Sequence, residues 1–118
     1  MHELSLMQGV LDSIKPVALE NGATAVTCIT LDIGEMTQVV EEAMQFAFDA
    51  LTEGEELFDG AELVMNFIPC RSKCFECGAE FSHDRYHMKC PECASGHTIV
   101  VSGKEMHIAS IEIENGED

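Results

Sequence analysis

Basic residues are scarce in this sequence of 118 residues, which has 6 lysines and arginines against 22 aspartates and glutamates and a formal net charge of −16. So acidic a surface repels nucleic acid and anionic lipid at ordinary salt. We therefore expect neither as a partner. Most of the acids are interpreted as solvated surface charge.

Long apolar runs are also missing, since no stretch approaches the roughly 20 apolar residues that span a bilayer. The opening Met-His-Glu-Leu-Ser lacks a basic region followed by an apolar run, so we do not expect a secretory signal. The sequence has no phosphate-binding glycine loop and no convincing Ser/His/Asp or Cys/His set. A soluble, cytoplasmic protein that is not an enzyme is the resulting expectation.

The spacing of apolar residues predicts helices over residues 4–20 and 38–51, the second capped by Thr37. Asn21-Gly22 should stop the first helix, and Pro16 should kink it or end it early because proline lacks an amide donor. Alternating and β-branched residues predict strands over 25–33, 61–68, 98–101 and 106–114. The fold class is therefore α/β (α+β), a small mixed sheet with two helices.

The charge is distributed unevenly along the chain. Residues 70–103 hold four acids and four bases, which leaves 22 − 4 = 18 acids and 6 − 4 = 2 bases for the rest. The segment has few large apolar residues, so it needs a metal to hold it together. We expect a discontinuous main domain, 1–69 plus 104–118, with a metal-binding domain, 70–103, inserted in it.

Two Cys-x-x-Cys pairs, Cys74/Cys77 and Cys90/Cys93, form the strongest motif. Such pairs build knuckles in which two thiolates hold one ion and nearby backbone amides donate to the sulfurs. Four thiolates saturate a tetrahedral zinc and leave no position for substrate, so a structural zinc site is predicted. Iron, as in a rubredoxin-like electron carrier, stays open because spacing alone does not choose the metal. A dithiol–disulfide switch is chemically feasible but less favoured.

Other residues near the motif have plainer interpretations. Cys70 could exchange into the cage or be a bystander, and Cys28 is expected to be a small buried hydrophobe. His83 and His87 lie between the pairs and could compete for the metal, but with four cysteines already present they are expected to be mostly surface polar residues. The bases of the segment either offset the charge of a zinc tetrathiolate or simply decorate the surface.

A histidine stands at position two. The amine of Met1, the backbone nitrogen of His2 and its imidazole can close two chelate rings on one cation, and nitrogens in a plane suit Ni(II) or Cu(II). The amide of Glu3 or a side chain from elsewhere could complete a square. Taken alone, this pattern is more often an ordinary solvated histidine.

Three features occur together in one order: the opening Met1-His2-Glu3-Leu4-Ser5-Leu6, the segment Leu31-Asp32-Ile33-Gly34-Glu35, and the paired knuckles. In this combination the chain resembles the HypA/HybF family of hydrogenase nickel-incorporation proteins over essentially its full length. The resemblance implies a nickel metallochaperone with a small α/β nickel domain and a zinc-ribbon-like lobe.

The resemblance also implies a ligand set and partners. His2 matches the nickel ligand, with Met1 and Glu3 beside it, and Cys74, Cys77, Cys90 and Cys93 match the zinc ligands. The implied partners are a HypB-type GTPase and the hydrogenase large subunit, with urease as a further client in some organisms. A homodimer is left open.

One departure concerns the histidine that several relatives carry directly after the last cysteine. Here Ala94-Ser95-Gly96 precedes His97. We weigh His97 equally as a further nickel ligand and as a surface residue. Two other classes stay as alternatives to the chaperone: a rubredoxin-like iron electron carrier and a zinc-ribbon interaction module.

Overall fold

A computed structural model describes residues 2–84 and 87–116, without the side chain of His2. The elements follow in the order α1 (His2–Glu20), β1 (Ala23–Gly34), η1 (Glu35–Thr37), α2 (Glu41–Thr52), η2 (Glu56–Phe58), β2 (Glu62–Ile68), β3 (Arg71–Cys74), β4 (Glu80–Ser82), β5 (Thr98–Ser102) and β6 (Met106–Asn115), where η marks a 3₁₀ helix. The expected α+β class is confirmed.

Helix α1 buries Met7, Leu11, Ile14 and Ala18, the middle of the predicted apolar stripe, whereas Leu4 and Leu19 at its two ends are exposed. It ends at Glu20, where the amide of Gly22 donates to the carbonyl of Leu19. Of the two expected effects of Pro16, a kink or an early end, the early end is wrong, because α1 continues to Glu20. Pro16 is on the exposed side, and burial of Ile14 and Ala18 around it maintains the helix despite the lost amide donor.

Helix α2 packs on α1 and buries Met44, Ala47 and Phe48. The predicted cap at Thr37 is wrong, since α2 begins at Glu41 and Val40 occupies the N-cap without a side-chain bond. Thr37 belongs to η1, where its hydroxyl donates to the Gly34 carbonyl over 2.7 Å. That local bond competes with helix capping and moves the helix start by three residues.

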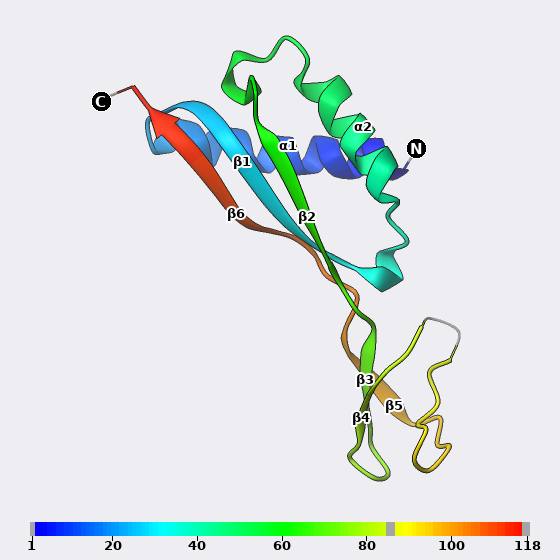
Figure 1. The fold of residues 1–118 in the computed structure, drawn as a ribbon. Helices are drawn as coiled ribbons and strands as arrows, with labels where there is room; N and C mark the ends of the chain where they lie inside the picture. Colours follow the sequence, from blue (N-terminus) through cyan, green and yellow to red (C-terminus); the bar gives the residue numbers. More distant parts are fainter. Residues whose placement is uncertain (1, 85–86, 117–118) are drawn as a thin grey trace. The chain divides into compact units, whose positions relative to one another are not determined.

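The first sheet has the order β2-β1-β6. Figure 1 shows β1 and β2 running in one direction and β6 against them, so the sheet is mixed as predicted. Ile29, Leu31 and Ile33 alternate along β1, and all three are fully buried. The final strand therefore pairs with an earlier strand, as its apolar character predicted.

The second sheet has the order β4-β3-β5 and lies wholly in the cysteine segment. Strand β3 pairs antiparallel with both neighbours. Only β5 of these three strands was predicted. Strands β3 and β4 are short and mostly polar, and periodicity gives little sign of them.

The described chain divides into two compact units. The first comprises residues 1–31, 39–65 and 108–118, and the second 32–38 and 66–107. The first contains both α-helices, and the second contains η1 and the whole β4-β3-β5 sheet. Within the described residues, no helix has the length and apolar character that crossing a membrane requires.

Candidate metal centre

The first Cys-x-x-Cys pair lies at the turn of the β3–β4 hairpin. Cys74 is the last residue of β3, and its amide donates to the Ala79 carbonyl over 2.9 Å. The Gly78 amide in turn donates to the Cys74 carbonyl over 2.9 Å, and the Glu76 amide to the Cys74 sulfur over 3.3 Å. These bonds fold Cys74–Ala79 into a knuckle with both thiols on one side.

The second pair repeats the same bonds in the loop between β4 and β5. The Cys90 amide donates to the Ser95 carbonyl over 3.0 Å, and the Ala94 amide to the Cys90 carbonyl over 2.8 Å. The Glu92 amide donates to the Cys90 sulfur over 3.4 Å. The two knuckles thus share one backbone design although only the first is attached to a strand.

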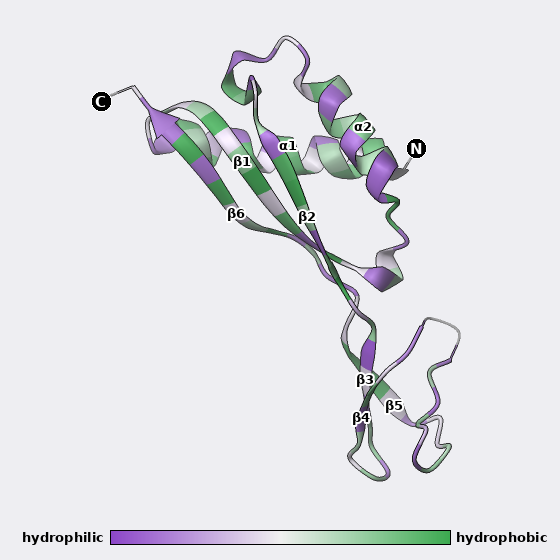
Figure 2. Ribbon diagram, in the orientation of Figure 1, coloured by the Kyte–Doolittle hydropathy of each residue, from purple (hydrophilic) through white to green (hydrophobic). Residues whose placement is uncertain are grey.

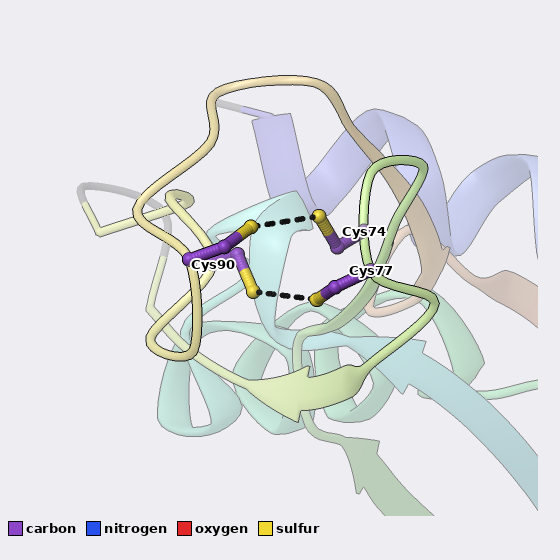
Figure 3. Close-up of side chains that lie close together, drawn as sticks. Cys74, Cys77 and Cys90 are labelled. Carbon is purple, nitrogen blue, oxygen red and sulfur yellow. Dashed lines mark hydrogen bonds between the residues drawn. The ribbon is translucent and has the colours of Figure 1, made fainter.

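The four thiols converge, with all sulfurs within 4.8 Å of one another. Cys74 Sγ lies 3.6 Å from Cys93 Sγ, and Cys77 Sγ lies 3.6 Å from Cys90 Sγ (Figure 3). A tetrahedron of sulfurs at ~2.3 Å from a zinc ion has edges of ~3.8 Å. The predicted cluster of Cys74, Cys77, Cys90 and Cys93 therefore has the donor set and spacing that a tetrathiolate metal requires.

The electrostatics of the four thiols favour a cation at this cluster. The backbone amide of Cys77 donates to Cys74 and lowers the pKa of its thiol to about 7. The Ser95 amide favours the Cys93 thiolate, but hydrogen bonding with Cys74 and partial desolvation of the thiolate outweigh it and raise the pKa of Cys93 to about 12. The first thiolate thus opposes the formation of others beside it, and a divalent cation removes that opposition.

The four cysteines of the cage differ in solvent exposure. Cys74 and Cys90 are buried and pack with Phe81 and Ala79, whereas Cys77 and Cys93 are exposed. Since so few apolar residues form this core, the metal would supply much of the cohesion of the segment.

His83 is held away from the cage by two hydrogen bonds. Its Nδ1 donates to the backbone carbonyl of Asp84 over 2.6 Å, which leaves Nε2 to accept from the Ser72 hydroxyl, also at 2.6 Å. Both ring nitrogens are engaged, so the ring does not compete for the metal. Ser72 is fully buried, and its role was not predicted because the sequence pattern did not reveal β3.

The remaining candidates near the cage lie as follows. Cys70 is buried, which raises the pKa of its thiol, and it lies outside the cluster of four cysteines. Arg71 pairs with Glu80 at 3.7 Å. His87 pairs with Asp84 at 2.7 Å. His97 Nδ1 contacts Glu76 Oε1 at 3.0 Å with the imidazole largely exposed.

The N-terminal candidates are described only in part. Met1 and the side chain of His2 lie outside the described residues. Glu3 is in the first turn of α1, and its Oε2 accepts a hydrogen bond from the Val40 amide over 3.2 Å. The carboxylate of Glu3 thereby connects the start of α1 with the residue that precedes α2.

Fold and site together define a small α+β protein with a zinc-ribbon-like cluster of four cysteines. Residues 1–113 match the family model described as "Hydrogenase/urease nickel incorporation, metallochaperone, hypA". The chain belongs to this HypA family, which confirms the resemblance found in the sequence.

The chain aligns with similar proteins over nearly the full length of each. The chain is 40% identical over 118 residues to the hydrogenase maturation factor HypA of Chlorobium luteolum, covering 99% of this chain and 100% of that protein. It is 41% identical to the factor of the same name from Caldanaerobacter subterraneus, covering 97% and 100%. In fold it is similar to the Ni metallochaperone HypA from Helicobacter pylori, with a TM-score of 0.68 at 22% identity over 96% of this chain and 97% of that chain.

Proposed function

We propose that this protein is a nickel metallochaperone that binds Ni(II) at its N-terminus and delivers it for maturation of [NiFe]-hydrogenase. Membership of a nickel-incorporation family over residues 1–113 carries the proposal. The cage supports it, because four thiolates that saturate a zinc ion leave no position for a transferable cargo. The cargo then needs a separate site.

The proposed nickel ligands are the Met1 amine, the His2 backbone nitrogen and the His2 imidazole, with Glu3 beside them. Helix α1 begins at His2, and the first amides of a helix have no acceptor within it. The His2 nitrogen is thus not committed to a helical hydrogen bond. A site with few ligands at a chain end releases its ion readily when a better site is offered.

His97 remains a further candidate ligand. Its contact with Glu76 uses Nδ1, and a metal bound through Nε2 would keep that contact as an outer-shell interaction. We keep both interpretations, nickel ligand and surface residue, for the test below.

We assign the cage of Cys74, Cys77, Cys90 and Cys93 to structural zinc. Residues 70–103 would then form the zinc-binding domain, and 1–69 with 104–118 the nickel-binding domain. The iron alternative predicts a red, redox-active protein. A colourless protein with about one equivalent of zinc would reject that alternative.

The partners we propose are a HypB-type GTPase and the hydrogenase large subunit, with urease as an alternative client. A net charge of −16 supports protein partners rather than nucleic acid or membrane. The proposed role is delivery in the cytoplasm without catalysis.

Titration calorimetry of Ni(II) into tag-free His2→Ala tests the terminal site. We expect its nickel affinity to fall at least tenfold, because the variant loses one imidazole ligand. His87→Ala is the matched control, since His87 is also an exposed histidine and contacts Asp84. His97→Ala, tested in parallel, decides between its two interpretations.

Wild-type affinity should also fall as the pH drops, because the amine and the imidazole must lose protons with reference pKa values near ~8 and ~6.5. Extra residues before Met1 should also weaken binding, because they convert the Met1 amine into a peptide nitrogen and so remove one ligand. Unchanged affinity in His2→Ala would reject the terminal site.

A further inference from the structure

The β4-β3-β5 sheet has two chemically different faces. One face carries Ser72, Cys74 and Phe81, all buried, of which Cys74 and Phe81 belong to the small core at the cage. The other face carries the alternate residues of the same strands: Arg71, Lys73, Glu80, Ser82, Ile99 and Val101, all of them exposed. The β3–β5 register shifts between Arg71 and Ser72, so Val101 has no directly paired residue on β3. We call this second face the outer face.

Apolar side chains stand exposed on the outer face and beside it. Ile99 is 48% exposed, Val101 49% and Phe75 70%. Phe75 directly follows β3, and its amide donates to the His97 carbonyl over 2.9 Å, so it continues the row of Arg71 and Lys73. None of the three belongs to the small core of Cys74, Phe81 and Cys90. Exposed apolar residues that gather in this way mark interaction surfaces.

Basic side chains lie next to this apolar row. Lys73 is directly opposite Ile99 on one side and Glu80 on the other. Arg71 pairs loosely with Glu80, at 3.7 Å. Figure 2 shows the contrast between hydrophobic β5 and hydrophilic β3. The outer face thus carries two bases, Arg71 and Lys73, and one acid, Glu80. The chain outside residues 70–103, by contrast, has 18 acids and two bases.

We propose that the outer face, with Phe75, is a docking surface for an extended segment of a partner protein that alternates apolar and acidic residues. The apolar side chains would cover Phe75, Ile99 and Val101, and a carboxylate would pair with Lys73. Strand β5 is at the edge of the described sheet, a place where extended segments commonly bind. This proposal is independent of where nickel binds.

Charge complementarity selects this occupant. Lys73 and Arg71 would repel a basic segment. The 18 acids outside residues 70–103 would repel nucleic acid and anionic lipid. A second copy of this chain is the competing occupant, because its acidic surface could also face Lys73. Oligomeric state separates these two occupants.

The probe is a synthetic peptide of about eight residues that alternates leucine and glutamate, added to the zinc-loaded, ¹⁵N-labelled full chain. We expect amide shifts that concentrate at Lys73, Phe75, Ile99 and Val101 and saturate with peptide. Higher salt should weaken the binding. A peptide with lysine in place of glutamate should cause no saturating shift there.

Matched variants locate the contribution of each part. Phe75→Ser, Val101→Ser and Lys73→Glu should each weaken peptide binding roughly fivefold or more. Phe46→Ser and Val17→Ser are the controls, since Phe46 is 70% exposed and Val17 48%. The controls should change the Kd less than about twofold. Zinc content by native mass spectrometry shows that each variant keeps its cage.

Three results would overturn the proposal. The first is an absence of saturating shifts on the outer face. The second is an equal loss of binding in Phe46→Ser and Phe75→Ser. The third is wild-type self-association that Val101→Ser abolishes, because the occupant would then be a second copy.

Discussion

Gly78 and Ala94 occupy equivalent positions in the two knuckles, four residues after the first cysteine of each. Each donates its amide to that cysteine's carbonyl, and each has a positive φ, 76° for Gly78 and 60° for Ala94. The left-handed region is open to glycine but strained for alanine. The second knuckle therefore contains strain that the first avoids.

Ala94→Gly should stabilise the zinc-loaded protein by about 0.5–1 kcal/mol, since relief of the strained φ exceeds the added flexibility of the unfolded chain. Gly78→Ala should destabilise it by a similar amount, because open space around Gly78 leaves conformation as the main effect. Thermal unfolding by circular dichroism would show these changes as shifts of roughly 2–5 °C in Tm.

Gly96→Ala is the control for that pair. Gly96 does not adopt a positive φ, and a Cβ there would meet no atom within 4 Å. Its Tm should stay near the wild-type value or rise slightly. A lower Tm for Ala94→Gly would show that the left-handed residue is not strained.

Zinc binding at about pH 7.5 should release at least two protons. In the metal-free cage the pKa of Cys93 is raised to about 12 and that of Cys77 is also raised, while that of Cys74 is lowered to about 7. Cys93 and Cys77 therefore carry protons that zinc must displace, and Cys74 is mostly ionised already. Affinity should rise with pH, about 100-fold per unit for two protons.

Calorimetry in buffers of different ionisation enthalpy counts these protons directly. Cys28→Ala, which changes a thiol outside the cage, should leave the count unchanged. Release of fewer than two protons would mean that the thiols ionise more easily than their mutual repulsion implies.

Helices and strands with clear apolar periodicity could be predicted from the sequence, and so could the cage, from the spacing of its cysteines. Helix α1 and strands β1, β2, β5 and β6 show their apolar patterns, and two Cys-x-x-Cys pairs have few other uses. Strands β3 and β4 escaped prediction because their buried residues are Ser72, Cys74 and Phe81, an unusual set for a strand. These two strands form because of the cage and because β3 pairs with β5. The local sequence encodes neither of these long-range interactions.

The predicted start of α2 is wrong for a local reason. Threonine is a good N-cap, but the Thr37 hydroxyl donates to the Gly34 carbonyl and Gln38 adopts a φ of 62°. This hydrogen bond and the left-handed conformation of Gln38 belong to a separate 3₁₀ turn before the helix. A single sequence does not show which of two favourable hydrogen bonds a hydroxyl will make.

Pro16→Ala should stabilise the protein by about 1–2 kcal/mol. Alanine restores the amide that proline lacks inside α1, and the gain is partly offset because proline also restricts the unfolded chain. Urea unfolding would measure the change. Leu19→Ala, at a 63% exposed position of the same helix, should stay within about 0.5 kcal/mol of wild type. No gain in Pro16→Ala would mean that the helix accommodates proline without loss.

Gly34→Ala should be the most damaging of these substitutions. A Cβ on Gly34 would collide with the Gly103 carbonyl group and would lie 2.6 Å from the Glu105 nitrogen. The close approach is fixed on both sides, because the Gly34 amide donates to the Glu105 carbonyl over 2.6 Å and the Met36 amide to that of Gly103 over 2.8 Å. Backbone atoms cannot move aside as a flexible side chain can, so at least one of these bonds must break.

We expect Gly34→Ala to lose about 3 kcal/mol or more of unfolding free energy in zinc-buffered urea titrations. Gly9→Ala is the matched control, because Gly9 lies inside α1 with nothing within 4 Å of a new Cβ. Alanine there should raise stability by about 1 kcal/mol through helix propensity. The same substitution thus has opposite signs at the two sites. A loss below about 1 kcal/mol in Gly34→Ala would show that the Gly34–Gly103 contact is looser in solution.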